Sequence, residues 1–252
     1  MSFTIPQNLF INDSTVITVV KCNDDAVTVQ HIEPLLLDAI DRVLGVSATY
    51  GKACQLSSIA FSTLSRVLVV NIPARHTPQL KHANQQRVAR SRTLIQDRLL
   101  LNPNLRKHAF KMDQLAVALY LDLSIRINDA VDMLSVTTND SRQSLQALMN
   151  AMGGELNLQR KNVQSLFFDT SKSTTMDAAA RVALEAWGAC RAATLPHMSP
   201  RFAPLPSIDT LAFPKAVWSL VHLCIALLTC RKKSSIWLLW RAFPEPQTVW
   251  MP

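Results

Sequence analysis

The chain has 252 residues, of which 48% are hydrophobic, so it is long enough to bury a substantial core in one large domain, with or without an appendage. Its 26 lysines and arginines outnumber its 18 aspartates and glutamates, and its five cysteines are widely spaced without a Cys-x-x-Cys pair. This pattern argues against a disulfide scaffold or a structural zinc site, and the first residues lack the segments of a secretory signal. We therefore expect an intracellular protein, either cytoplasmic or nuclear.

The first third of the chain predicts strands around one helix. Residues 15–20 are rich in β-branched side chains, which is typical of a strand. Apolar residues recur at helical spacing over 27–42, and Pro34 is expected in the first turn of that helix. Three further strands are predicted at 43–50, 53–61 and 65–72.

Helices and strands alternate in the rest of the predicted domain. Helices are expected at 85–101, 114–121, 141–152 and 176–193, and strands at 105–112 and 125–133. Ser141 is a plausible cap of the third of these helices, and Gly153 and Gly154 end it. This order predicts an α/β fold with a mixed sheet and helices on both faces. Sites in such sheets lie at the carboxyl ends of parallel strands, where Ser47 and Thr49 fall.

The positive charge is confined to one stretch. Between Ala74 and Met112 there are nine basic residues and one acid, so this segment carries the whole net charge of +8. Such a segment neutralises phosphates, and we expect it to bind RNA or DNA, preferably single-stranded. The predicted contacts are Arg87, Arg90, Arg92, Arg106, Lys107 and Lys111. The alternative is a solvated surface that only aids solubility.

The order of segments and several short motifs resemble a known family. Residues 44–49 read Leu-Gly-Val-Ser-Ala-Thr, and 51–60 read Gly-Lys-Ala-Cys-Gln-Leu-Ser-Ser-Ile-Ala. Further on, 107–113 read Lys-His-Ala-Phe-Lys-Met-Asp, 128–133 read Asn-Asp-Ala-Val-Asp-Met, and 144–148 read Ser-Leu-Gln-Ala-Leu. Over about residues 14–195 the chain resembles the ribonuclease-H-like 3′–5′ exonuclease domain of the DnaQ superfamily, in the branch of the Werner-syndrome exonuclease and RNase D.

The resemblance implies a site in which four carboxylates hold two divalent cations, Mg²⁺ or Mn²⁺. Here Ser47 and Thr49 occupy the two positions of the family's Asp-x-Glu motif. Asp113 matches the middle acid, Glu185 replaces the last one, and Arg181 stands where a Tyr or His would position water. Hydroxyls bring no charge and a fixed cation repels metal, so the resemblance implies lost or weak hydrolysis, and no residues are assigned as metal ligands.

Each of these side chains also has a simpler interpretation. Asp113 would cap the following helix, and Glu185 would be a solvated side chain on a helix. Lys111 and Arg181 would pair with nearby acids rather than with phosphate. Asp132 is expected to be structural.

The C-terminal part differs in composition. We expect the exonuclease-like domain at 14–195, with 74–104 as a basic insertion and helix, followed at 196–252 by a proline-rich linker and an apolar, Trp-containing tail. The apolar run 216–230 is shorter than the roughly 20 residues that span a membrane. A membrane span is therefore not expected, and a membrane is the less expected partner. The tail would be a membrane-associating segment or would bind a protein partner, or it would have no selected role.

Three functional classes follow from these patterns. The first is a nucleic-acid-binding protein with an exonuclease fold and lost or weak hydrolysis. The second is an active, metal-dependent exonuclease with a rearranged site that draws on Asp38, Asp41 or Asp113. The third is a non-catalytic protein-interaction scaffold.

Overall fold

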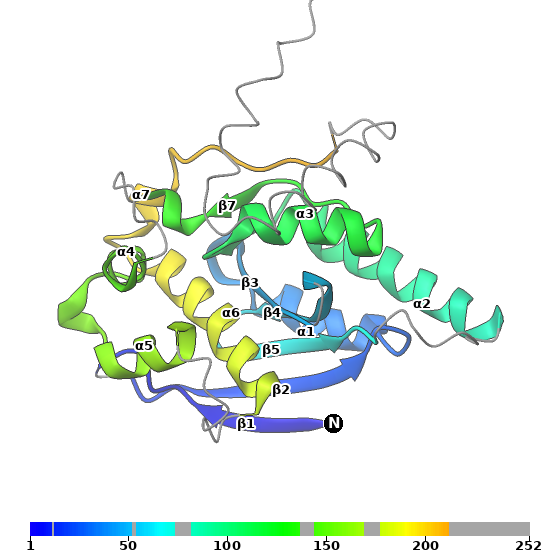
Figure 1. Cartoon of the computed structure of the whole chain (residues 1–252), viewed down its shortest axis with the longest axis horizontal. Coiled ribbons are helices and arrows are strands. Elements are labelled where there is room, and N and C mark those ends of the chain that lie inside the picture. Colours follow the sequence, from blue (N-terminus) through cyan, green and yellow to red (C-terminus); the bar gives the residue numbers. More distant parts are fainter. Residues whose placement is uncertain (12, 52–53, 74–81, 137–143, 169–176, 212–252) are drawn as a thin grey trace, which may run out of the picture. The chain divides into compact units, whose positions relative to one another are not determined.

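The computed structural model describes residues 1–11, 13–51, 54–73, 82–136, 144–168 and 177–211. One compact unit spans Met1–Leu211 (Figure 1). The unit extends beyond the predicted domain limits of 14 and 195 at both ends. The predicted Trp-containing tail from residue 212 onward lies outside the described residues, as does Ser141.

The described residues form a seven-stranded sheet in the order β1-β2-β5-β4-β3-β6-β7. Its central strands β3, β4 and β5 form an antiparallel meander. Strand β2 runs parallel to β5, while β6 and β7 continue parallel to β3 on the other side. The strands are β1 (Ser2–Pro6), β2 (Val16–Asn23), β3 (Val43–Tyr50), β4 (Leu56–Ser62), β5 (Arg66–Asn71), β6 (Arg106–Ala109) and β7 (Ala130–Asp132). This mixed sheet confirms the predicted fold class.

Helices cover both faces of the sheet. Successive residues of a strand point to opposite sides, so each central strand presents apolar side chains to a helical layer on either face. On β5, Val67 and Val69 belong to one apolar cluster, and Leu68 and Val70 belong to the other. The first cluster includes α4 (Leu145–Ala151), α5 (Arg160–Phe168), α6 (Ala178–Thr194) and α7 (Ser199–Phe202). The second includes α1 (Val29–Asp38), α3 (Met112–Leu123) and the π-helical turn η3 (Gln96–Leu100), which continues α2 (His82–Ile95). Short 3-10 turns are η1 (Ile40–Arg42), η4 (Met133–Val136) and η5 (Glu155–Asn157).

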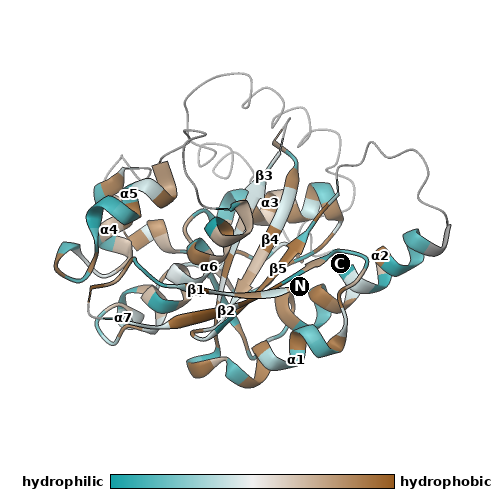
Figure 2. Ribbon diagram, turned by 90° about the horizontal axis from the view of Figure 1, so that it is seen from below, coloured by the Kyte–Doolittle hydropathy of each residue, from teal (hydrophilic) through white to brown (hydrophobic). Residues whose placement is uncertain are grey.

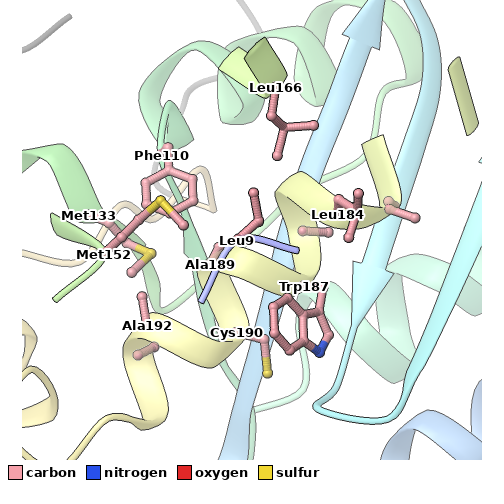
Figure 3. Packing of buried hydrophobic residues seen from close by; sticks show 14 of the residues in the cluster. Leu9, Phe110, Met133, Met152, Leu166, Leu184, Trp187, Ala189, Cys190 and Ala192 are labelled. Atoms are coloured by element: carbon pink, nitrogen blue, oxygen red, sulfur yellow. The ribbon is translucent and has the colours of Figure 1, made fainter. Parts of the chain in front are cut away.

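Helix α6 packs across the middle of the sheet, over β3, β4 and β5. Its Trp187 is fully buried, donates a hydrogen bond of 2.8 Å from Nε1 to the carbonyl of Leu64, and meets the ring of Phe10 edge-on. Figure 3 shows Trp187 and Cys190 within this core. The approach is close because β3 has a glycine there: a Cβ on Gly45 would lie 2.1 Å from the carbonyl oxygen of Ala186.

Residues 203–211 run beside the edge strand β7. Ile208 forms an antiparallel bridge with Ala130, and the hydroxyl of Thr210 accepts a hydrogen bond of 2.9 Å from the backbone N–H of Ile127. Arg126 donates to the carbonyls of Thr210 and Leu211. This stretch, predicted to be a linker, therefore covers the sheet edge and belongs to the compact unit.

Other predictions differ from the structure in detail. Pro34 lies inside α1, beyond its first turn, so the prediction of its place was wrong. Helix α4 begins after Ser144, whose hydroxyl accepts a hydrogen bond of 3.1 Å from the backbone N–H of Ala147. Strand β1 and helix α5 had no counterpart in the prediction. No helix among the described residues is long and apolar enough to cross a membrane.

Candidate functional site

The site predicted from the resemblance lies at the carboxyl half of β3, on the face that α6 covers. Ser47 follows Gly45 by two residues and therefore points to the same side of the sheet. Its hydroxyl donates a hydrogen bond of 2.8 Å to Oε2 of Glu185 on α6. Ser47 and Glu185, which are far apart in the sequence, are thus in direct contact.

Thr49 lies one step further along the same face. Its hydroxyl is hydrogen-bonded to the hydroxyls of Ser57, at 2.8 Å, and Ser58, at 2.6 Å. Ser58 is the residue that pairs with Thr49 across the β3–β4 hairpin. The two hydroxyls that the resemblance aligns with the Asp-x-Glu motif are therefore both hydrogen-bonded within the protein.

Glu185 is surrounded by donors and positive charge. Its side chain is 18% exposed, and the Nε of Arg181, one helical turn earlier, lies 3.5 Å from Oε1. Burial raises the pKa of this carboxyl group, and the hydrogen bond from Ser47 and the charges of Arg181 and Lys111 oppose the rise. The alternative of a solvated Glu185 is wrong, whereas the pairing of Arg181 with a nearby acid is confirmed.

Lys111 and Asp113 lie at the start of α3, directly after β6. Lys111 is exposed and occupies the N-cap position of the helix. Asp113 sits in the first turn, where its Oδ1 accepts a hydrogen bond of 2.7 Å from the backbone N–H of Gln114. The alternative that Asp113 is the cap residue is therefore wrong, although it does bind a backbone group of the first turn.

Several acidic side chains lie close enough to Tyr50, at the end of β3, to affect the pKa of its phenol. Burial raises the pKa of its phenol, and the negative charges of Asp113, Asp122 and Glu185 raise it further. Asp122 was not predicted as part of this region. Its Oδ2 accepts a hydrogen bond of 2.9 Å from the backbone N–H of Leu56, so it holds the start of β4 against α3.

These residues do not fit a two-metal centre. Mg²⁺ and Mn²⁺ favour several oxygen ligands, with anionic carboxylates prominent among them. Within the described residues, no three or more His, Cys, Asp or Glu side chains are grouped so that they could hold a metal ion. Asp38 is bound to the hydroxyls of Thr63 and Ser65, near the turn that follows β4 and thus at the opposite end of β3. It therefore contributes nothing to the site at Ser47.

The six predicted phosphate contacts divide into two groups. Arg87 and Arg90 are exposed on α2, which extends outward from the sheet in both views (Figures 1 and 2). Lys111 is exposed at the start of α3. Arg92 instead forms an ion pair of 2.7 Å with the buried Asp24, which fixes α2 to the end of β2.

The other two predicted contacts also have partners within the protein. Arg106 lies 3.6 Å from Asp129 and donates to the carbonyls of Ala203 and Leu205. Lys107 is fully buried and its Nζ donates to the carbonyl of Asn102 and to Oδ1 of Asn128, at 3.0 and 2.9 Å. Burial lowers the pKa of Lys107 to about 8. These contacts are structural, so Lys107 is not part of the surface that we propose below.

Asp132 has the structural role that was predicted. It is buried at the end of β7, and its Oδ1 accepts a hydrogen bond of 3.0 Å from the backbone N–H of Leu134. The carboxylate therefore holds the turn into η4.

The architecture agrees with the fold that the resemblance implies. The antiparallel strands β3, β4 and β5 are followed along the chain by β6 and β7, which run parallel to β3, and the long helix α6 crosses the sheet beside the site. The chain has a ribonuclease-H-like α/β fold.

Several solved structures are similar to this chain. The EXO domain of Aedes aegypti Nibbler is 13% identical, with a TM-score of 0.40 over 73% of this chain and 86% of that one. Trypanosoma brucei RNase D, in complex with GMP, is 13% identical, with a TM-score of 0.43 over 82% of this chain and 63% of that one. The EXD2 exonuclease domain soaked in Mn and dGMP is 15% identical, with a TM-score of 0.33 over 86% and 97%. No family model and no curated protein matches the sequence.

Proposed function

We propose that this protein binds single-stranded nucleic acid through an exonuclease fold whose hydrolytic activity is lost or weak. The observation that carries the proposal is the hydrogen bond from Ser47 to Glu185. At this place the resembling family has acids that share metal ions, whereas here a hydroxyl satisfies one carboxylate directly. A carboxylate that contacts a hydroxyl and an arginine has its charge balanced within the protein, whereas clustered carboxylates repel one another.

The exposed basic residues support binding. Arg87, Arg90 and Lys111 are open to solvent, and the segment that contains them carries the net charge of the chain. Phosphate groups are the ligands that such a surface attracts, and the attraction falls with salt because bound counterions are released. The predicted protein partner of the C-terminal tail stays a prediction.

The test is digestion and gel mobility of a 5′-labelled single-stranded oligonucleotide, as RNA and as DNA, with Mg²⁺ or Mn²⁺. The double variant Asp113→Ala, Glu185→Ala runs beside the unaltered protein. An intact oligonucleotide with reduced mobility at low salt supports the proposal. If the oligonucleotide is neither cleaved nor shifted, the proposal is contradicted and the protein-interaction scaffold is favoured.

An active exonuclease with a rearranged site is the second candidate. It is favoured by the three carboxylates whose charges act on Tyr50. A ladder of products shortened from the 3′ end, made by the unaltered protein and lost in the double variant, would establish this second candidate.

A further inference from the structure

Helix α2 and the π-helical turn η3 form one continuous helical rod with arginines open to solvent. Arg87, Arg90 and Arg98 are exposed, and the first two are separated by three positions of the helix. Arg98 follows about two helical turns after Arg90, so the three side chains lie along one flank of the rod. At the rise of a helix they extend over about 16 Å. We name these three residues the α2 arginine stripe.

The other sides of the rod are fixed to the protein. Ile95 and Leu99 are buried in the apolar cluster on the face of the sheet opposite α6. The hydroxyl of Ser91 donates a hydrogen bond of 3.2 Å to the carbonyl of Val27, and Arg92 pairs with Asp24. These contacts set the orientation of the rod, so the stripe is held facing outward.

The arginines of the stripe keep their donors for an external ligand. Arg90 and Arg98 form no side-chain hydrogen bond or ion pair with the residues that the structure describes, and Arg87 has only a hydrogen bond to the amide oxygen of Asn84. Arg92, on the other flank, is consumed by its ion pair. A free guanidinium binds a phosphate group through two parallel N–H groups, which gives strong and directional contacts.

We propose that the α2 arginine stripe binds the phosphodiester backbone of a nucleic-acid strand that lies along α2, on the face of the sheet opposite the contact between Ser47 and Glu185. This rests on the proposed function and adds Arg98 as a binding residue. After η3 the chain enters β6, whose first residue pairs with Val43 at the start of β3. Arg98 therefore lies towards the end of the sheet that is remote from Ser47.

The stripe stays positive when the acids near it are included. The rod carries four arginines and one acid, Asp97, which is exposed beside Arg98. Asp24 and Asp25 follow β2 near the start of the described part of α2, and Asp24 is paired with Arg92. Four positive and three negative charges leave one net positive charge, and the two groups of the internal ion pair cancel one another.

Basic side chains also outnumber acids beyond the end of η3. Asp129 lies 3.6 Å from Arg106, and Asp209 is exposed on the stretch beside β7. Arg126, whose backbone N–H is hydrogen-bonded to the rod, and the buried Lys107 complete this group. The acids at this end are therefore balanced locally and do not cancel the charge of the stripe.

The surface of the rod fits a charged polymer better than a protein partner. Its other exposed residues between 84 and 100 are small or polar, namely Gln85, Gln86, Ala89 and Thr93. None of the exposed large apolar side chains in the described part of the chain lies on it, whereas the centre of a protein interface is apolar or aromatic. The rod also has no aromatic residue on which bases could stack. Contacts to phosphate alone predict binding that does not depend on the base sequence.

The experiment is fluorescence anisotropy of fluorescein-labelled oligo(dT), oligo(dA) and oligo(U) with the full chain in 50 mM salt. We expect the dissociation constants to agree within about threefold, because phosphate contacts carry no sequence information. A preference of more than about tenfold for one base would overturn binding through the backbone alone.

Single variants test where the strand lies. Arg87→Gln, Arg90→Gln and Arg98→Gln should each weaken binding by about five- to tenfold and reduce the slope of log affinity against log salt by about 0.7. Asp97→Asn removes a negative charge beside Arg98 and should strengthen binding by about twofold. Lys161→Gln is the matched control, because Lys161 is an exposed cation on α5, in the layer on the other face of the sheet. It should bind within about twofold of the unaltered protein, as expected for a charge outside the contact.

The outcomes separate this proposal from the proposed function. If Arg98→Gln binds like Lys161→Gln while Arg87→Gln and Arg90→Gln lose affinity, the strand does not lie along α2 and the proposal is wrong. If the unaltered protein binds but no variant of the stripe loses affinity, nucleic-acid binding stands and the stripe is not its site. If the unaltered protein binds no oligonucleotide, the proposed function fails and the stripe has no such ligand. The three side chains are exposed, so we expect unchanged thermal unfolding, which attributes a loss of affinity to the lost contact.

Discussion

At the scale of single residues, the interpretation of the site depends on the contact between Ser47 and Glu185. A mostly buried carboxylate needs donors, and here they come from a strand hydroxyl and a neighbouring arginine. The resemblance placed both residues in one site. Their hydrogen bond was not predictable, because 138 residues separate them and the rotamers depend on how α6 packs on the sheet.

The variant Ser47→Asp tests this environment. It would bring a second carboxylate against Glu185, and the repulsion of like charges should destabilise the fold by about 2 kcal/mol at pH 8. The loss should shrink at pH 5, because the repulsion between the two carboxylates favours protonation of one of them as the pH falls. Urea unfolding at both pH values measures it, with Ser47→Asn as an uncharged control of the same size. Equal stability of the Asp and Asn variants at pH 8 would contradict the expectation.

His108 gives a prediction about acid sensitivity. It is buried on β6 beside the ring of Phe202, and burial together with the charge of Arg106 lowers its pKa to about 4. The unfolded chain takes up a proton near pH 6.5, whereas the folded protein does so only near pH 4. The stability from neutral His108 is therefore complete above pH 6.5 and is lost as the pH falls towards 4.

The expected loss of unfolding free energy on acidification follows from the difference between the pKa values of His108 in the folded and unfolded states. Between pH 7 and pH 5, the unaltered protein should lose about 2 kcal/mol more than the variant His108→Gln, which has nothing to protonate at this position. Urea unfolding of both proteins gives the difference, and groups common to both cancel. Equal losses in the two proteins would show that His108 is not held neutral.

At the scale of elements, the strands and helices with strong patterns were predictable. The predicted strand at 43–50 coincides with β3, and the predicted helix at 176–193 nearly matches α6. Strand β1 was missed because a short segment ending in Pro6 has little pattern by itself, and only pairing with β2 makes it a strand. Helix α5 has only nine residues and buries only Val163 and Leu166, so it is shorter than the window over which helical spacing can be recognised.

Only part of the candidate site could be predicted, because some of its residues come together only in the folded chain. The resemblance marks positions along the chain, so Ser47, Asp113 and Glu185 could be found. Ser57 and Ser58 join the site only through the hairpin register, and counting back from the β3–β4 turn would have found them. The burial of Lys107 was hidden, because a lysine in a basic segment gives no sign of an inward side chain.

The contact between α6 and β3 gives an element-scale prediction. Gly45→Ala should destabilise the protein by about 3 kcal/mol, because the added Cβ would overlap the backbone of α6 at Ala186. Gly51→Ala is the matched control on the same hairpin, since its Cβ would meet its nearest neighbours at 3.7 and 3.9 Å. Thermal unfolding compares the two variants. If both unfold at the same temperature, α6 is not held against the glycine as described.

At the scale of the whole molecule, charge is distributed unevenly between sequence segments. The residues between Asp41 and Asp97 include no acid, so every charged side chain of β3, β4, β5 and α2 is basic. Some of these basic side chains form ion pairs within the protein, as Arg92 does with Asp24. The remaining ones create a field that acts on a charged polymer beyond the range of individual contacts.

The salt dependence of nucleic-acid binding measures how many basic side chains contact phosphate groups. With three contacts from Arg87, Arg90 and Lys111, the affinity for a single strand should fall roughly twentyfold between 50 and 200 mM salt. The slope of log affinity against log salt would be about −2. Anisotropy titrations at four salt concentrations determine it, and a slope near zero would contradict electrostatic binding.

The packing of α6 on β3 also has a consequence for biosynthesis. All seven strands of the described sheet leave the ribosome before α6, which ends at Thr194. Until then, the sheet face that includes Ile17, Val67 and Val69 lacks the helix that covers it, and contacts at such long sequence separation form slowly. A nascent chain arrested before α6 would therefore hold the strands of the sheet but neither Arg181 nor Glu185. The contact between Ser47 and Glu185 therefore forms only in the last stage of synthesis of this unit.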